Sequence, residues 1–360
     1  MDPVRPEYEG AGITNLVRGL QSKAAWVPDP AREADSVVLL ILDGLGWNEL
    51  QRRRERLPNL AALDGGAITS VVPSTTPTAL TSISTGLSPA AHGVVGYRIW
   101  LGRNVLNVIR WAMQGQTPPE PDEIQPREAF GGQVLPVVSR AGFRDSKFTA
   151  MLYRGAAFHG YHSTSGLVEH CRLLTGQGNR FVYAYYDGPD LVAHVHGMRD
   201  GFFERELGFC DRLVDELLHA LPKTTALVVT ADHGHVHFDE RIELGGLLDD
   251  MCVAQSGESR FRYLHARDGA AADLLEAASA LFSDRAWCFT RDRLIDEGWL
   301  GTRPPSPEVR RRIGDVVLAA YAPIGFVDPN NPGEGLLRSG HGSLTSDEML
   351  VPLVAAAGRG

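Results

Sequence analysis

Continuous apolar runs that end in polar residues alternate along much of the chain with segments of helical periodicity. The run 36–44 (SVVLLILDG) is apolar from position 37 until its final aspartate and glycine, which is typical of a strand buried on both faces of a parallel sheet. Comparable runs occupy 180–188 (RFVYAYYDG) and 224–235 (TTALVVTADHGH), and a long helix is predicted over 202–221. Strands followed by helices predict an α/β fold with a mostly parallel sheet flanked by helices.

The segments between these units carry weaker patterns. From them we predict helices over 13–22, 50–63 and 134–140, strands over 67–72 and 146–152, and a loop over 154–162. Residues 97–111 are predicted to form a β-hairpin excursion. A change of composition after about 255 indicates a small inserted α/β subdomain, 256–322, so the catalytic domain would comprise 1–255 and 323–360.

The stretch Val71–Gly86 (VVPSTTPTALTSISTG) joins an apolar segment to a helix. Pro77 suits the first turn of a helix, where its missing N–H would have no partner, and Gly86 suits the end. Thr76 is therefore expected at a strand-to-helix junction, with its hydroxyl at the positive end of the helix dipole. Taken alone, Thr76 would be an ordinary N-cap residue.

Composition and charge narrow the classes of function. The 360 residues are 43% hydrophobic and 22% charged, which is ordinary for a globular protein. The net charge of −9, without a basic block, argues against binding to a nucleic-acid backbone. Four scattered cysteines favour a reduced, cytoplasmic protein. No signal peptide is expected, and no apolar run approaches the ~20 residues of a membrane span.

Several acidic and histidine residues lie at the ends of the predicted strands, on one predicted helix or in a glycine-flanked loop. The set comprises Asp43, Asp190, His194, Asp232, His233 and His341. Asp190 and His194 are four positions apart, so they would share one face of a helix, and His341 lies between two glycines. Singly, each has a structural explanation as a turn, cap or loop residue. Together with Thr76 they indicate a metal site, and oxygen and imidazole ligands without cysteine suit zinc or manganese.

The motifs that carry these residues resemble a known superfamily. In chain order they are LLILDG, PSTTPTALTSISTGLSPAAHGVVG, YYDGPDLVAHVHG, TADHG and SGHG, and they span most of the chain. This ordered set resembles the alkaline phosphatase superfamily, most closely its type I phosphodiesterase/nucleotide pyrophosphatase branch. The resemblance implies an alkaline-phosphatase-like fold and a metal-dependent phosphoric ester hydrolase.

The resemblance also implies a site with two divalent metal ions, Zn²⁺ or alternatively Mn²⁺. One ion would be held by Asp190, His194 and His341, and the other by Asp43, Asp232, His233 and the nucleophile. In this branch the nucleophile is a threonine ten residues before the glycine of a T-G pair, which here is Thr76. The expected reaction cleaves a phosphodiester or pyrophosphate bond through a covalent phospho-threonine-type intermediate.

One departure from the branch concerns the phosphate. The branch usually has Phe-Pro-Asn after its threonine, whereas this chain has Pro77, Thr78 and Ala79. The missing donor would come from the N–H groups at the helix start or from Arg98, Arg103 or Arg110 of the excursion. Of these, Arg98 and Arg110 are the predicted substrate-binding residues. Three more histidines are interpreted as lying beside the ligands or at the rim, namely His196, His235 and His237.

Three alternatives stay open. A phosphomonoesterase would need extra cationic contacts for the additional charge of its substrate, and a phosphonate hydrolase is a further possibility within the superfamily. No arginine is tied to Thr76 by spacing, so a small-molecule phosphodiester or nucleotide is favoured. The non-enzyme alternative is a metal-retaining, inactive binding module, which the presence of all six ligand residues and the threonine disfavours.

Overall fold

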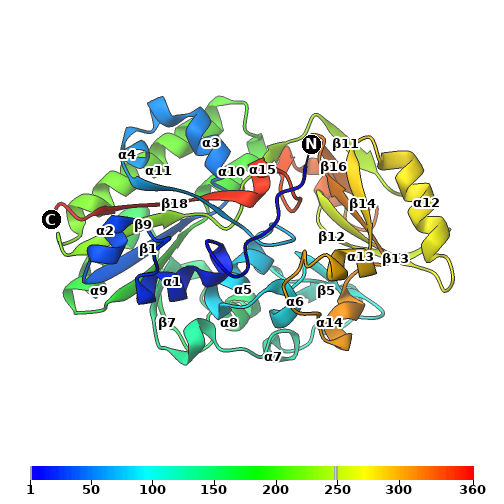
Figure 1. Cartoon of the computed structure of the whole chain (residues 1–360), viewed down its shortest axis with the longest axis horizontal. Coiled ribbons are helices and arrows are strands. Elements are labelled where there is room, and N and C mark those ends of the chain that lie inside the picture. The colour runs from blue at the N-terminus through cyan, green and yellow to red at the C-terminus, as the bar shows by residue number, and fades with distance from the viewer. Residues whose placement is uncertain (1, 247, 249) are drawn as a thin grey trace.

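The computed structural model describes every residue except 1, 247 and 249, and its centre is a seven-stranded sheet (Figure 1). In spatial order the strands are β2 (Asp64–Thr69), β18 (Leu350–Ala357), β9 (Thr225–Thr230), β1 (Ser36–Leu42), β8 (Phe181–Tyr186), β6 (Pro136–Arg140) and β7 (Ala157–Tyr161). Strand β18 is antiparallel to both of its neighbours, and the other strand pairs of this sheet are parallel. The predicted α/β fold with a mostly parallel sheet is confirmed.

The carboxyl ends of the three central strands lie side by side. In β1, Leu42 pairs with Tyr186 of β8 and Ile41 pairs with Thr230 of β9. All three strands are buried along almost their whole length, as their continuous apolar runs predict. Because of this register, the polar segments that follow the strands leave the sheet at the same edge, where ligands bind in open α/β sheets.

Helices cover both faces of the central sheet. Figure 1 shows α3 (Trp47–Arg52), α4 (Pro58–Ala61) and α11 (Gly201–Ala220) on one side, with α1 (Leu16–Ser22), α5 (Thr76–Thr85) and α8 (Lys147–Leu152) on the other. The other helices of this part are α2 (Asp29–Glu33), α6 (Pro89–His92), α7 (Pro121–Ile124), α9 (Thr164–Gly176), α10 (Gly188–His196) and α15 (Ser346–Met349).

A second, antiparallel sheet lies beside the first (Figure 1). Its order is β12 (Cys252–Gly257), β13 (Phe261–Ala266), β15 (Val316–Ala320) and β14 (Ala286–Thr290), and its helices are α12 (Ala271–Phe282), α13 (Arg291–Asp296) and α14 (Pro307–Arg312). This sheet starts at Cys252, slightly before the predicted insert at 256. The exact limits of the insert, 256–322, stay a prediction.

Three small sheets complete the strands. They pair β10 (Val236–His237) with β17 (Ser339–Gly340), β11 (Glu240–Glu243) with β16 (Ile324–Val327), and β4 (Val105–Asn107) with both β3 (Arg98–Trp100) and β5 (Ala112–Met113). The last of these contains the predicted hairpin of 97–111. Short 3₁₀ turns are η1 (Ile13–Asn15), η2 (Arg54–Arg56), η3 (Ala129–Gly132), η4 (Ala141–Phe143) and η5 (Pro332–Leu336).

Three predictions of element type were wrong. Residues 134–140 contain the strand β6 instead of a helix, because β-branched valines in a short apolar run fit a strand flanked on both sides. Residues 146–152 form the helix α8 instead of a strand. This helix is started by Ser146, the N-cap residue, whose Oγ accepts a hydrogen bond from the Thr149 N–H at 3.0 Å. The predicted loop 154–162 contains the edge strand β7.

Other predictions had the right type and the wrong extent. The predicted helix 50–63 is broken into α3, η2 and α4, and Pro58 begins the last of these pieces. The predicted strand 67–72 ends at Thr69 in β2, and the helix of 13–22 starts with the 3₁₀ turn η1. The long helix of 202–221 is confirmed as α11, one residue earlier at each end.

Candidate active site

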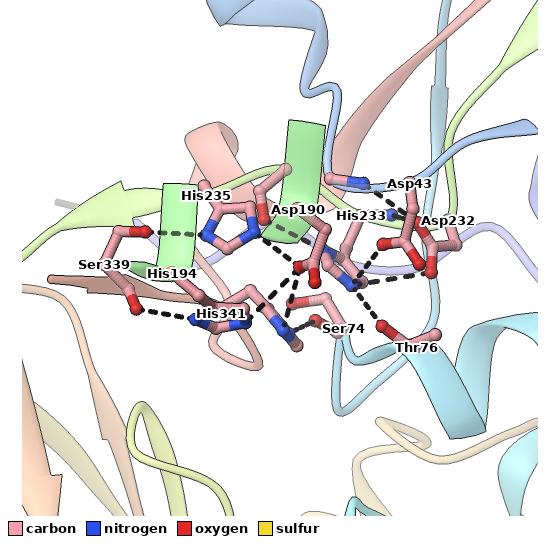
Figure 2. A network of polar contacts seen from close by, with 12 residues as sticks. Asp43, Ser74, Thr76, Asp190, His194, Asp232, His233, His235, Ser339 and His341 are labelled. Carbon is pink, nitrogen blue, oxygen red and sulfur yellow. Dashed lines mark hydrogen bonds and ion pairs between the residues drawn. The ribbon is translucent and has the colours of Figure 1, made fainter. Parts of the chain in front are cut away.

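Asp43, Asp232, His233 and Thr76 form the first of two groups at the carboxyl edge of the sheet (Figure 2). Asp43 follows β1, Asp232 and His233 follow β9, and Thr76 begins α5. The Nε2 atom of His233 lies 3.0 Å from Thr76 Oγ1 and 3.5 Å from both Asp43 Oδ1 and Asp232 Oδ2. These two carboxylate oxygens are buried without a hydrogen-bond partner in the described part of the chain. Two carboxylate oxygens, one imidazole nitrogen and one hydroxyl therefore converge on the same space.

The remaining polar atoms of this group are held by the protein. The Tyr185 hydroxyl donates to Asp43 Oδ2, while the N–H groups of Gly44 and His233 donate to Asp232 Oδ1 at 3.2 and 3.0 Å. His233 Nδ1 lies 3.1 Å from the main-chain carbonyl of the next residue. A carbonyl oxygen only accepts, so Nδ1 carries the proton and Nε2 presents a lone pair to the convergent space.

Asp190, His194, His235 and His341 form the second group, in which one ligand atom of each residue lies within 4.8 Å of the others. Asp190 Oδ1 lies 3.3 Å from His194 Nε2 and 3.6 Å from His341 Nε2. Asp190 and His194 occupy one face of α10, as their spacing predicts. Asp190 also groups with Asp43 and His233, so the two groups adjoin each other.

The two histidines predicted as ligands of this second group are also oriented by carbonyl groups. His194 Nδ1 lies 2.9 Å from the Ser339 carbonyl oxygen, and His341 Nδ1 lies 3.1 Å from that of Ser74. Each Nδ1 therefore donates to a carbonyl, which leaves the Nε2 atom of each ring directed toward Asp190. Such outer hydrogen bonds are the usual means by which proteins fix the orientation of metal-binding imidazoles.

Burial and neighbouring charges shift the pKa values of the three aspartates of the site. Burial raises the pKa of Asp43 well above its usual value, and the charges of Asp232 and Asp190 raise it further. Burial likewise raises the pKa of Asp232. Burial alone would also raise the pKa of Asp190, but the adjacent His194 brings it well below its ordinary value. Ionisation of Asp43 and Asp232 is therefore unfavourable unless a positive charge lies nearby.

The pKa values of His233 and His341 favour the neutral imidazole form, which can bind a cation. Burial lowers the pKa of His233, and it lowers that of His341 well below the usual value. Both rings are therefore neutral at pH 7, the form in which histidine binds metals. The separations of 3.0–3.6 Å between ligand atoms are close to the ~3.3 Å edge of a tetrahedron with metal–ligand bonds of ~2.0 Å. The residues present thus fit a pair of divalent cations.

The three extra histidines occupy different places. His235 is buried within the second group, and its Nε2 lies 2.7 Å from Asp190 Oδ1. His196 is exposed and stacks on Phe202, and half-buried His237 accepts from the Met198 N–H at 3.3 Å. His196 and His237 line a separate surface cavity of about 420 Å³. Of these three histidines, only His235 lies among the predicted ligands. Its position two residues after His233 in the sequence is consistent with this placement.

The two predicted substrate-binding arginines are placed apart. Arg98 is buried in β3, and its Nη1 donates to Asp328 Oδ2 at 2.5 Å, with Glu334 Oε1 at 3.9 Å. Arg110 is exposed in the loop after β4. No local pattern predicts the pairing of Arg98 with Asp328, because the two residues lie far apart in the chain. Contact of either arginine with a substrate stays a prediction.

Sequence reasoning also missed several residues that support the site. Tyr185 lies in the aromatic run of β8, where nothing distinguishes a tyrosine that reaches a carboxylate from one that only packs. Ser74 and Ser339 act through main-chain carbonyls, for which side-chain identity carries no signal. These contacts depend on the meeting of segments that lie far apart in sequence.

Comparison with known proteins identifies the family. Residues 37–342 match the family described as type I phosphodiesterase / nucleotide pyrophosphatase. The match covers most of the chain, so the protein belongs to this family of hydrolases, as its motifs predict. Comparison with curated protein sequences gives no match.

Several solved structures share the fold of this chain. Murine ectonucleotide pyrophosphatase / phosphodiesterase 5 superposes with a TM-score of 0.67 at 15% identity, covering 89% of this chain and 87% of that one. A second murine structure, an inactive threonine-to-alanine variant in complex with AMP, has the same values. The human protein gives a TM-score of 0.64 at 16% identity with the same coverage. At these identities the similarity establishes the fold.

Within residues 2–246, 248 and 250–360, no helix combines the length and apolar character that crossing a bilayer requires.

Proposed function

We propose that the protein is a two-metal-dependent hydrolase of phosphodiester or pyrophosphate bonds in which Thr76 is the nucleophile. The observation that carries the proposal is the convergence of Thr76 Oγ1 and His233 Nε2 with two buried oxygens, Asp43 Oδ1 and Asp232 Oδ2, that have no hydrogen-bond partner among the described residues. An unpaired buried carboxylate oxygen costs folding free energy, so a site that keeps two of them is built to receive a cation.

In the proposed reaction the Thr76 oxygen attacks phosphorus while the bond from phosphorus to the leaving oxygen breaks. The threonine loses its hydroxyl proton to solvent, and the leaving oxygen takes one up. Water then displaces Thr76 from phosphorus, which restores the hydroxyl and releases the second product. Thr76 lies at the N-terminus of the ten-residue helix α5, whose free N–H groups and dipole favour the negatively charged phosphoryl group.

The divalent cations would be held by Asp190, His194 and His341 and by Asp43, Asp232 and His233. Bound there, they would supply positive charge that lowers the pKa of the threonine hydroxyl and neutralises the phosphoryl oxygens. The protein leaves Thr76 only 7% exposed, so its hydroxyl meets solvent and substrate over a small area. Zinc fits the mixed oxygen and imidazole donors, and manganese is the second candidate.

A diester or nucleotide is the favoured substrate class. A monoester carries more negative charge and needs additional cations around its terminal oxygens. Arg98 is the first arginine or lysine after Thr76 in the chain, and its guanidinium is already paired with Asp328. The AMP bound to the murine relative supports the inclusion of nucleotides among the test substrates.

Turnover of matched p-nitrophenyl substrates would test the proposal. The panel comprises bis(p-nitrophenyl) phosphate, the p-nitrophenyl ester of AMP, p-nitrophenyl phosphate and a p-nitrophenyl phosphonate, each with zinc and with manganese. We expect the diesters to be hydrolysed fastest and a chelator to stop the reaction. Faster hydrolysis of the monoester or the phosphonate would reassign the substrate class, while chelator-insensitive turnover would contradict the metal requirement.

Replacement of the nucleophile gives the first specific prediction. Thr76→Ala should lower kcat about 10³-fold or more while both metals still bind, because only the attacking oxygen is removed. Thr76→Ser should retain part of the activity. The matched control is Thr75→Ala, which changes the preceding residue and should keep most of the turnover. Loss of activity in Thr75→Ala with full activity in Thr76→Ala would shift the nucleophile by one position.

A further inference from the structure

His235 occupies a distinct position in the second group (Figure 2). It follows β9 by five residues, and its side chain is completely buried. Its Nε2 lies 2.7 Å from Asp190 Oδ1, and its Nδ1 lies 3.2 Å from the hydroxyl oxygen of Ser339. Both ring nitrogens therefore have a polar partner within the protein.

Hydrogen-bond chemistry fixes the tautomer of this ring. A carboxylate oxygen only accepts, so the proton between His235 and Asp190 is carried by Nε2. Nδ1 is then the acceptor, and the Ser339 hydroxyl donates to it. With both nitrogens engaged, His235 has no lone pair left for a cation.

The spacing around Asp190 separates His235 from the other two imidazoles. His194 Nε2 and His341 Nε2 lie 3.3 and 3.6 Å from Asp190 Oδ1, close to the ~3.3 Å edge of a tetrahedral zinc site. The 2.7 Å separation of His235 is instead that of a charge-assisted hydrogen bond. The Nδ1 atoms of His194 and His341 are held by main-chain carbonyls, which leaves both Nε2 atoms available to a cation, whereas both ring nitrogens of His235 have partners within the protein.

The loop after β1 leaves room for the His235 ring. A Cβ atom on Gly44 would lie 2.8 Å from His235 Cδ2 and 3.0 Å from Nε2, which is closer than side chains pack. Gly44 also has a φ of +76°, a conformation that favours glycine. The glycine that follows Asp43 therefore lets the imidazole lie directly against Asp190.

We propose that His235 is a positioning residue of the Asp190–His194–His341 site, which orients the Asp190 carboxylate by a hydrogen bond and does not itself bind the metal. The inference rests on the proposed two-metal function, because Asp190 is oriented toward a cation. Hydrogen bonds from outside the ligand set hold carboxylates in the geometry that a metal needs, and their loss typically costs 10–100-fold in metal affinity.

Zinc affinity measured on the metal-free full-length protein would test the role of His235. Competition with a chromogenic chelator gives a Kd for each of the two sites. His235→Leu removes the hydrogen bond and keeps a similar volume, so we expect one Kd to rise about 10–100-fold and the other to stay unchanged. His235→Gln keeps an N–H donor, so its Kd values should stay within about threefold of those of the wild type.

The control variant is His219→Leu, which removes an exposed histidine on α11 and should leave both Kd values unchanged. Equal weakening by His235→Gln and His235→Leu would make His235 a direct ligand and overturn the proposal. Unchanged affinity in His235→Leu would overturn it as well. Thermal unfolding of each metal-free variant shows that the fold is retained, and the Gln variant keeps the test valid if the Leu variant unfolds.

This outcome is separable from failure of the proposed function. If the wild-type protein binds no zinc, the two-metal function fails. If the wild type binds two ions and His235→Leu binds both as tightly, only the role of His235 fails.

Discussion

Glu258 is a buried carboxyl group near Thr75, the residue that precedes helix α5. It lies in the turn between β12 and β13, and it packs so closely against Gly342 that a Cβ atom there would lie 2.6 Å from Glu258 Cγ. Burial raises the pKa of Glu258 to about 8, although nearby Thr75 and Arg262 lower it. At neutral pH the group is therefore mainly protonated in the folded protein.

This raised pKa predicts a specific pH dependence of stability. Between pH 4.5 and about 8 the folded state holds a proton on Glu258 that the unfolded state releases, so the free energy of unfolding falls as pH rises. In Glu258→Gln this loss disappears. The stability of the variant relative to wild type should rise by up to about 1.4 kcal/mol per pH unit over this range. Urea unfolding of the metal-free proteins at pH 5, 6.5 and 8 measures it, and a constant difference would contradict the prediction.

The candidate ligand residues could be predicted from the sequence, whereas the residues that orient their side chains could not. The six predicted ligands do lie in two adjoining groups, because polar residues after parallel strands share one edge of the sheet. Whether they bind metal stays a prediction. The contact of Tyr185 with Asp43 and the pairing of Arg98 with Asp328 depend on tertiary packing, and no local pattern encodes them.

Among the elements, the turn between β12 and β13 joins the second sheet to the site. Its Arg260 is fully buried and binds Glu348 of α15 through two nitrogens, at 2.8 and 2.9 Å. Glu348 in turn accepts from the Ser343 N–H at 2.9 Å, and its carbonyl accepts from the Gly234 N–H at 2.9 Å. One ion pair thus ties the insert to the segments that carry His233 and His341.

Breaking this ion pair should destabilise the protein strongly. Arg260→Met leaves Glu348 charged and buried without its partner, so the free energy of unfolding should fall by about 3–5 kcal/mol. The double variant Arg260→Met/Glu348→Gln, which removes the stranded charge, should recover part of the loss. The control is Arg310→Met, since Arg310 pairs with Asp292 at the surface and its loss should cost at most about 1 kcal/mol. Equal losses in urea unfolding for Arg260→Met and Arg310→Met would falsify the prediction.

Element type was predictable where apolar runs were long and less so where they were short. Strands β1, β8 and β9 are buried on both faces, and their sequences are apolar or aromatic apart from Ser36, Thr225 and Thr230 at strand ends. Strand β6 and helix α8 span only five and six residues, lengths at which periodicity does not separate strand from helix. There the β-branched valines and the Ser146 cap decide the outcome.

Repulsion among the carboxylates of the site affects the stability of the whole molecule when no metal is bound. Asp43 and Asp232 are buried, Asp190 is half-buried, and the charges of Asp232 and Asp190 both raise the pKa of Asp43. Folding the metal-free chain must therefore pay the cost of neutralising or burying these charges. A bound cation would offset it, so metal affinity and fold stability are coupled.

This coupling predicts opposite effects of one substitution with and without metal. The raised pKa of Asp43 means that the metal-free folded state binds a proton that the unfolded state releases above pH 3.8, so stability falls as pH rises. At pH 8 without metal, Asp43→Asn should therefore have a higher Tm than wild type, and this advantage should shrink toward pH 5.

With zinc at 100-fold excess over Kd, the wild type should gain about 2.7 kcal/mol per site, and the variant should lose the gain from one site. Calorimetry with and without chelator measures both effects, and a metal-free variant that is less stable than wild type at pH 8 would refute the repulsion at Asp43.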